Sequence, residues 1–234
     1  MIKPFNRYIV VGCKSWHRGV FTEVLSKLAG EWHYVCEREQ LSLARIREVR
    51  PRYAFFLHWS WKVPPDILEA AECVCFHMTD VPYGRGGSPL QNLIARGHRD
   101  TKLTALRMTS ELDGGPIYLK RDLSLEGGAE EIYLRACTLS ASMIQDIVRD
   151  EIQPFPQLGE PVTFRRRKPE ESQILRLNSL EQLHDFIRML DAEGYPRAFL
   201  SYNGYRFEFS RSALYHERIV ADVQITLEPK EPKQ

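Results

Sequence analysis

Short apolar runs alternate with amphipathic segments along the first third of the chain. Four runs have the β-branched or aromatic composition of buried strands: YIVVGC (8–13), HYVCE (33–37), YAFFLHW (53–59) and ECVCFHM (72–78). Apolar residues at helical spacing separate them, and these segments cover 15–28, 41–49 and 64–69. Strands that alternate with helices in this way predict βαβ units and a mostly parallel sheet.

The middle of the chain follows a different pattern. Two strand-like runs at 103–108 and 117–125 predict a hairpin. Apolar residues at helical spacing then predict a long helix over 129–152. The segment PFPQLGEP at 154–161 is rich in Pro and Gly and is the best linker candidate.

The C-terminal part combines both kinds of element. TFRRR reads as a strand, a helix over 179–193 begins with Asn178 and Glu181 in a capping-box pattern, and two further strands lie near 197–209 and 216–228. We therefore expect an α/β fold: a Rossmann-like domain over 1–155 and a small α+β subdomain over 156–234.

Composition and charge narrow the class of protein. The 234 residues are 43% hydrophobic and 27% charged, with no run long enough to span a bilayer and no signal peptide at the start. Five cysteines, an odd count, predict free thiols and a cytoplasmic protein. The net charge of +1 argues against a nucleic-acid partner. The basic run 165–168 is either a solvated strand edge or a phosphate site.

His77 is the strongest candidate for chemistry. It ends the fourth apolar run and precedes a Gly-rich loop at 82–87. Ligands of open parallel sheets bind beyond the carboxyl ends of the strands, and glycines let a ligand approach the backbone. Asp113, in an Asp-Gly-Gly turn, supplies a carboxylate of the kind that orients an imidazole. A lone strand histidine is more often structural, but these two features favour a catalytic role.

Other chemistries fit less well. Cys73, Cys75 and His77 share one strand face, but their spacing of about 6.5–7 Å is too wide for one tetrahedral metal ion. We therefore expect no metal. The sequence lacks the P-loop, dinucleotide and serine-hydrolase patterns. Nothing marks Cys75 as an activated nucleophile.

The stretches VPYGRGGSP and LTALRMTSELDGGPIY resemble the catalytic core of the formyltetrahydrofolate-dependent formyltransferases. The matching residues are His77, Pro82, Arg85, Gly86, Pro89, Thr104 and Asp113 to Ile117. Two positions depart from the family pattern. Cys75 stands where the family has Asn, and Arg107 stands where it has a second histidine.

The resemblance implies a division of labour within the site. His77 and Asp113 would be catalytic, shuttling a proton from the amine to the departing folate nitrogen. The formyl donor would be N10-formyltetrahydrofolate, bound by Trp61, Lys62, Val63, Arg85, Gly86 and Leu112. Substrate binding is expected of Lys14, Ser88 and Asn92.

The segments RRRKPEESQI and LHDFIRMLDAEGYPRAFL resemble the tail of sugar N-formyltransferases. The expected acceptor is therefore a nucleotide-linked, UDP-type 4-amino-4,6-dideoxy sugar used for surface polysaccharides, with no nucleic acid or membrane partner. Methionyl-tRNA or a carrier-bound aminoacyl group as acceptor, hydrolysis of formyltetrahydrofolate, and a non-catalytic folate or nucleotide binder remain alternatives, and Cys75 keeps the last one open. The aromatic residues Tyr202, Tyr205, Phe207 and Phe209 further predict that the small subdomain forms a homodimer.

Overall fold

The computed structural model describes residues 6–228, which pack as two units. Unit 1 contains the residues up to Gly86, Thr101–Leu123 and Leu134–Thr163. Unit 2 contains Gly87–Asp100, Ser124–Tyr133 and the residues from Phe164 onward. Each unit is therefore built from segments that are separated in the sequence. The expected boundary near residue 155 and the dimerisation role of the second part remain predictions.

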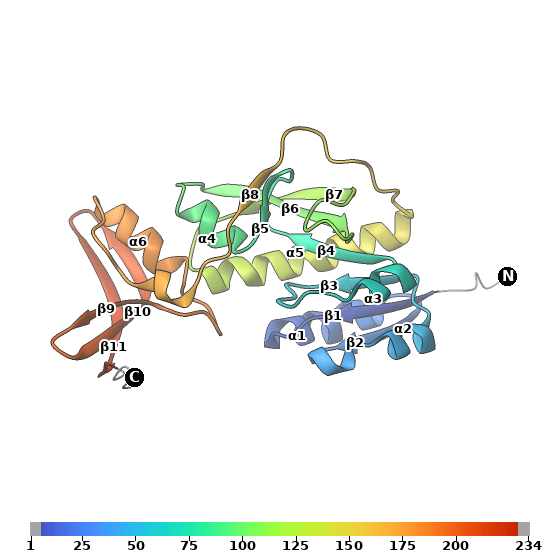
Figure 1. Cartoon of the computed structure of the whole chain (residues 1–234), viewed down its shortest axis with the longest axis horizontal. Coiled ribbons are helices and arrows are strands. Elements are labelled where there is room, and N and C mark those ends of the chain that lie inside the picture. The colour runs from blue at the N-terminus through green and yellow to red at the C-terminus, as the bar shows by residue number, and fades with distance from the viewer. Residues whose placement is uncertain (1–5, 229–234) are drawn as a thin grey trace. The chain divides into compact units, whose positions relative to one another are not determined.

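A six-stranded sheet with the order β2-β1-β3-β4-β6-β7 forms the centre of unit 1 (Figure 1). Its strands are β1 (Arg7–Val11), β2 (Glu31–Val35), β3 (Tyr53–Phe56), β4 (Cys73–His77), β6 (Asp100–Arg107) and β7 (Ile117–Ser124). β2, β1, β3 and β4 are parallel, whereas β6 runs antiparallel to β4. The predicted mostly parallel α/β sheet is confirmed.

Four helices occupy segments predicted to be helical: α1 (Ser15–Glu23), α2 (Leu43–Val49), α3 (Pro65–Ala70) and α5 (Ala129–Asp150). A further helix, α4 (Pro89–Ile94), precedes β6, and short 3-10 turns lie at Leu25–Lys27, Arg38–Gln40 and Pro169–Ser172. The helix expected over 15–28 is shorter, because Val24 leaves the helical conformation with φ −123°. Among the described residues, no helix has both the length and the apolar character needed to cross a bilayer.

The core of unit 1 explains why its first strands read as continuous apolar runs. All four residues of β3 are buried. Ile9, Val11, Ala54, Phe56 and Cys73 belong to one cluster, and each is at most 1% exposed. Parallel strands covered on both faces require apolar residues at successive positions, not only at alternate ones.

Unit 2 contains α6 (Leu180–Arg188) and an antiparallel sheet in the order β11-β10-β9. Its strands are β9 (Ala198–Tyr202), β10 (Tyr205–Tyr215) and β11 (Arg218–Leu227). The sequence predicted two strands here, and the first of them is divided into β9 and the start of β10. The extra turn is Asn203-Gly204, where both residues have positive φ (50° and 76°). An Asn-Gly pair is the usual two-residue hairpin connection, because it tolerates this conformation.

Helix α6 begins one residue later than expected and anchors unit 2. Ser179 caps it, because its Oγ accepts a hydrogen bond from Gln182 N at 3.2 Å. At the other end Arg188, only 4% exposed, donates from Nη1 to Leu125 O and Gly127 O at 2.6 and 2.8 Å. This buried guanidinium ties the segment before α5 to α6.

Candidate active site

His77 ends β4 and is 8% exposed. Its Nε2 lies 2.8 Å from the carbonyl oxygen of Gly84. A carbonyl only accepts hydrogen bonds, so Nε2 carries a proton and donates it to Gly84. The lone pair of the neutral imidazole is then on Nδ1. This nitrogen is the one that can take up a proton during a reaction.

Asp113 faces that nitrogen. Its Oδ2 lies 3.6 Å from His77 Nδ1 and accepts a hydrogen bond from Gly86 N at 2.9 Å. Asp113 has φ +51°, a left-handed conformation that Asp tolerates better than most residues. The turn also requires Gly115, because a Cβ there would lie 1.8 Å from Arg107 O. The Asp-Gly-Gly sequence is thus needed by the backbone as well as by the carboxylate.

The glycine-rich loop contains a short strand, β5 (Tyr83–Gly86), which pairs with β8 (Val162–Phe164). Gly84 and Gly86 have φ of +80° and +105°, values that residues other than glycine rarely adopt. Gly84 O binds His77 and Gly86 N binds Asp113. The strand therefore supplies one backbone anchor to each side chain of the pair.

Two further side chains join this arrangement, and sequence reasoning had missed one of them. Arg85 pairs through Nη1 with Glu111 at 2.6 Å. Its Nε and Nη2 donate to Gln157 Oε1 at 3.0 and 2.8 Å. Gln157 lies in the linker, where the sequence carries no local signal for a site. Arg85 had been assigned to the cofactor, and that role remains a prediction.

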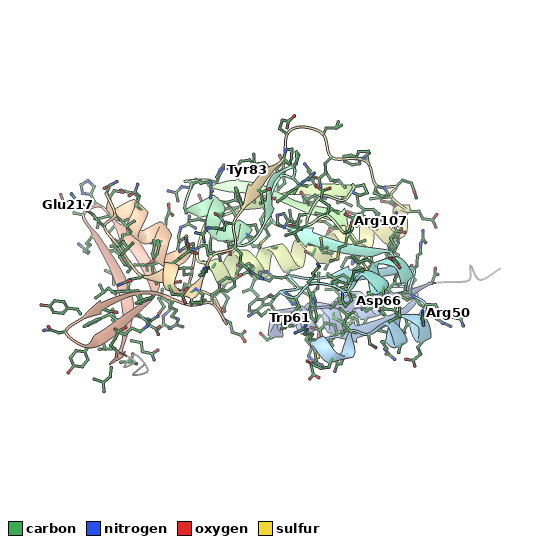
Figure 2. All side chains as sticks on the ribbon, in the orientation of Figure 1. Arg50, Trp61, Asp66, Tyr83, Arg107 and Glu217 are labelled. Atoms are coloured by element: carbon green, nitrogen blue, oxygen red, sulfur yellow. The ribbon has the colours of Figure 1, made fainter. Side chains whose placement is uncertain are left out.

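The other expected cofactor residues differ in exposure. Trp61 (Figure 2) and Leu112 are 40% and 70% exposed, unusually high for large apolar side chains. Lys62 is also exposed, whereas Val63 is 4% exposed and packs in the core. The Trp61 ring meets the ring of Trp59 edge-on at 4.6 Å. Of this set, Trp61 and Leu112 offer apolar surface to a ligand, while Val63 could contribute only its backbone.

The expected substrate residues lie in both units. In unit 1, Lys14 N donates to His17 Nδ1 at 3.2 Å, and Lys14 Nζ lies 5.8 Å from the centre of the Trp16 ring. In unit 2, Ser88 Oγ accepts from Arg167 N at 3.1 Å. Asn92 Nδ2 lies within 3.1 Å of three backbone carbonyl oxygens, those of Gly87, Ser88 and Arg165. Substrate binding by these residues remains a prediction.

The cysteines of β4 are poor candidates for reactive groups. Burial, and after it the nearby carboxylate of Asp113, raises the pKa of the Cys75 thiol. Burial likewise raises the pKa of Cys73 to about 12. Both therefore carry a proton at neutral pH and cannot act as thiolates. Within residues 6–228, no group of three or more His, Cys, Asp or Glu side chains is arranged to hold a metal ion. Independence from metals remains a prediction.

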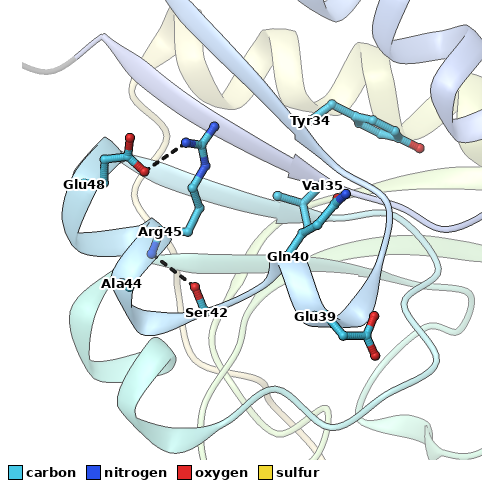
Figure 3. Close-up of a pocket in the computed structure, with 8 residues that line it drawn as sticks. All are labelled: Tyr34, Val35, Glu39, Gln40, Ser42, Ala44, Arg45 and Glu48. Atoms are coloured by element: carbon cyan, nitrogen blue, oxygen red, sulfur yellow. Dashed lines mark hydrogen bonds and ion pairs between the residues drawn. The ribbon is translucent and has the colours of Figure 1, made fainter.

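A surface hollow of about 530 Å³ lies elsewhere in unit 1, beside β2 and α2 (Figure 3). Its polar lining is partly paired internally: Ser42 Oγ accepts from Arg45 N at 3.2 Å, and Arg45 pairs with Glu48 at 2.9 Å. The residues that line it include none of the expected site residues.

The geometry of the pair suits proton transfer. His77 Nδ1 can accept a proton from an attacking amine, and the imidazolium that forms would lie beside the Asp113 carboxylate. An anion next to the imidazolium stabilises it, while Gly86 N holds the anion in place. The same imidazolium can then return the proton to a leaving group.

Known proteins match this chain over most of its length. A solved structure of a methionyl-tRNA formyltransferase from Clostridium thermocellum is 43% identical, with a TM-score of 0.90 over 94% of this chain and 99% of that one. The chain belongs to the formyltransferase family. Residues 169–226 also match the family model of the methionyl-tRNA formyltransferase C-terminal domain.

More distant relatives match over smaller shares of their own length. The methionyl-tRNA formyltransferase of Rickettsia massiliae is 32% identical over 165 residues, which are 68% of this chain and 54% of that protein. This member of the family thus spans about half the length of the curated relatives it matches. HypX from Aquifex aeolicus, solved with tetrahydrofolic acid, is 16% identical with a TM-score of 0.71, over 88% of this chain and 37% of that one.

These comparisons correct the expected acceptor. The assignment to a UDP-linked 4-amino-4,6-dideoxy sugar, and with it polysaccharide synthesis, is wrong, because the similar full-length chain and the C-terminal match are both named for methionyl-tRNA. Sugar N-formyltransferases appear among solved structures at only 13–17% identity, which shows the fold alone. The segment Phe186-Ile187-Arg188, part of the resemblance to sugar N-formyltransferases, has a structural role, because Arg188 donates to backbone carbonyls of unit 2.

The expected partners were wrong for a related reason. A nucleotide-linked amino sugar without any nucleic acid was inferred partly from the net charge of +1. A net charge sums over the whole surface, whereas phosphate contacts depend on local clusters of basic residues. Such a cluster exists in unit 2, where Arg165, Arg166 and Lys168 are exposed.

Proposed function

We propose that this protein transfers the formyl group of N10-formyltetrahydrofolate to the α-amine of methionyl-tRNA in the cytoplasm. The observation that carries the proposal is the pair of His77 and Asp113, with side chains 8% and 12% exposed and Nδ1 and Oδ2 3.6 Å apart, in a chain of the formyltransferase family. The name of the 43% identical relative supports methionyl-tRNA as the acceptor.

The reaction follows from the protonation states of the pair. The neutral amine attacks the formyl carbon, and a carbon–nitrogen bond forms in a tetrahedral intermediate. His77 Nδ1 accepts the proton that the amine nitrogen loses. The intermediate then collapses, the bond between the formyl carbon and N10 breaks, and His77 returns the proton to N10. The products are the formylated amine and tetrahydrofolate, and His77 regains its starting state.

Exposed apolar side chains support the choice of donor. Trp61 and Leu112 are 40% and 70% exposed. Large exposed apolar side chains commonly mark binding surfaces, and an aromatic ring favours a flat partner such as a pterin. We assign these two residues to the folate, together with the backbone of the segment that contains Lys62 and Val63.

A basic segment supports the choice of acceptor. Arg165, Arg166 and Lys168 are exposed in unit 2, and hydrogen bonds from Asn92 to Arg165 O and from Arg167 N to Ser88 Oγ fix their backbone. Arginines on a fixed backbone suit contacts with phosphodiester oxygens. In this proposal Ser88 and Asn92 support the tRNA-binding segment, and Lys14 faces the acceptor.

The test is a formyl-transfer assay on the purified chain with N10-formyltetrahydrofolate. Four acceptors are compared: methionyl-tRNA, uncharged tRNA, free methionine and an aminoacyl thioester on a carrier protein. We expect N-formylmethionyl-tRNA, detected by mass spectrometry after deacylation, and little product from the other three. Formylation of the carrier-bound aminoacyl group in preference to methionyl-tRNA would contradict the proposed acceptor. Absence of formyl transfer to any of the four would contradict the proposed activity.

A further inference from the structure

Gln157 lies in the linker that joins α5 to β8, within unit 1. Phe155, two residues before it, exchanges two backbone hydrogen bonds with Ile117, at 2.7 and 2.9 Å. On the other side, Val162 N donates to Pro82 O at 3.0 Å. The linker is therefore fixed at both ends, to the start of β7 and to the segment that leads into β5.

All four hydrogen-bonding positions of the Gln157 amide are used. Oε1 accepts from Arg85 Nε and Nη2, at 3.0 and 2.8 Å. Nε2 donates to Asp113 O and Gly115 O, both at 2.8 Å. A guanidinium only donates and a backbone carbonyl only accepts, so these partners determine which way the amide points. A glutamine that only filled space would not be expected to make all four of these hydrogen bonds.

These bonds close a ring around the catalytic carboxylate. The carboxylate of Asp113 accepts a hydrogen bond from Gly86 N, and the backbone carbonyl of Asp113 accepts one from Gln157 Nε2. Gln157 in turn binds the side chain of Arg85, the residue before Gly86. Asp113 is therefore fixed at two points to one strand, β5. His77 is attached to the same strand through Gly84 O.

We infer that Gln157 is a positioning residue for formyl transfer, and the inference rests on the proposed function. Gln157 acts through Asp113: it fixes the backbone of a turn whose left-handed residue carries the carboxylate, and so sets the distance to His77. Asp113 has φ +51°, an uncommon conformation for a residue with a side chain, so the turn depends on such contacts to keep it. A catalytic group displaced by about 1 Å can lose about 10²-fold in rate.

The decisive variant is Gln157→Glu, with Gln153→Glu as its control. Glu has the shape of Gln and still accepts from Arg85, but its carboxylate cannot donate to the carbonyls of Asp113 and Gly115. Gln153 lies in the same linker, is exposed, and donates from Nε2 to Glu151 O at 3.0 Å, away from the Asp113 turn. Both substitutions change the net charge by the same amount, and Gln157→Met removes the same donors without adding a charge beside Arg85, so an effect shared by Gln157→Glu and Gln157→Met reflects the lost donors.

Two measurements separate positioning from simple destabilisation. We expect kcat for methionyl-tRNA to fall about 10–100-fold in Gln157→Glu, with KM changed less than about threefold. We also expect the imidazole ¹⁵N chemical shifts of His77, assigned by comparison with His77→Asn, to move at pH 7. Gln153→Glu should change neither quantity. Gln157→Met, which keeps the length without any hydrogen bond or charge, should show the same two changes, and it replaces Gln157→Glu if the charged variant does not fold.

The inference is overturned if the folded variant keeps wild-type kcat, or if its kcat falls while the His77 shifts stay unchanged. The chemical-shift measurement needs no turnover. If the wild-type chain forms no product at all, the proposed function fails, and the His77 shifts still decide whether Gln157 positions the pair.

Discussion

His77 Nδ1 and Asp113 Oδ2 lie 3.6 Å apart, and both residues are anchored to the same strand. Gly84 O accepts from His77 Nε2, and Gly86 N donates to Asp113. The backbone of β5 therefore fixes the tautomer of the imidazole and the position of the carboxylate together. In the proposed reaction, which moves a proton off an amine and onto a leaving nitrogen, this geometry suits His77 as the proton carrier and Asp113 as its counter-ion.

Cys75→Ala should lower turnover less than about tenfold, well below the 10²–10³-fold loss typical of a missing oxyanion donor. Cys75 shares a strand face with His77, but burial and the Asp113 carboxylate raise its pKa, so it remains a weakly donating thiol. Steady-state formyl transfer measures the effect. Cys73→Ala, in the buried core, controls for the loss of a strand thiol. A Cys75→Ala loss as large as that of His77→Ala would make the cysteine part of the machinery.

The proximity of His77 and Asp113 could be predicted from the sequence because each of its signals is local, whereas their catalytic role stays a prediction. His77 ends an apolar run, and the Asp113 turn contains the glycine that a close backbone approach at Arg107 O requires. Gln157 could not be predicted. Its partners Asp113, Gly115 and Arg85 lie 44, 42 and 72 residues away in the chain, and a glutamine in a Pro-rich linker carries no pattern.

Other errors have equally definite causes. Asn178 was expected as the helix cap, but Ser179 next to it offers a hydroxyl that reaches Gln182 N. The Asn203-Gly204 turn was read through as one strand, although its two positive φ values require a hairpin there. The acceptor was misassigned because the motif around Arg188 stabilises the fold of unit 2 and therefore carries no information about the substrate.

The stability of the fold should decrease between pH 7 and pH 5 because of His17. Burial chiefly, and then the charges of His58 and Lys14, lower the pKa of His17 to about 3. Below its unfolded pKa of 6.5 the unfolded chain binds a proton that the folded chain does not. The contribution of neutral His17 to the free energy of unfolding is therefore fully present above pH 6.5 and is lost as the pH falls toward 3. The loss by pH 5 is about 2 kcal/mol.

Urea unfolding at pH 7 and pH 5 measures this loss. His17→Gln keeps an acceptor for Lys14 N but cannot titrate, so its free energy of unfolding should vary less with pH by about 2 kcal/mol. His216→Gln, which changes an imidazole whose side chain is 95% exposed, should follow the wild type. Identical pH dependence in wild type and His17→Gln would refute the assignment.

Arg166→Ala should weaken tRNA binding and reduce the slope of log K against log salt by about 1, as expected for one lost phosphate contact. Arg166 is exposed within the basic segment of unit 2. Fluorescence anisotropy with labelled tRNA at a series of salt concentrations provides the slope. Arg218→Ala removes an exposed arginine of β11 that lies over the Tyr215 ring and should leave the slope unchanged. Equal slopes for wild type and Arg166→Ala would exclude a phosphate contact at this residue.

The sheet of unit 2 should mediate dimerisation. It exposes several large apolar side chains, among them Tyr205 at 47%, Val223 at 45%, Ile225 at 57% and Leu227 at 76%. So much apolar surface on a small unit favours a partner. Sedimentation at micromolar concentration should give twice the 27.2 kDa of one chain. Ile225→Lys should give single chains, whereas Gln224→Lys, on the opposite strand face, should not. A wild-type species of one chain only would contradict the prediction.

The most direct test of the account is formyl transfer under single-turnover conditions by the wild type, His77→Asn and Asp113→Asn. Asp122→Asn, whose side chain is 87% exposed, serves as the control for loss of a carboxylate. With enzyme and N10-formyltetrahydrofolate in excess over methionyl-tRNA, both site variants should transfer about 10²–10⁴-fold more slowly than the wild type. Asp122→Asn should match the wild type. Formyl transfer at the wild-type rate by a folded His77→Asn variant would contradict the central claim that this histidine carries the proton.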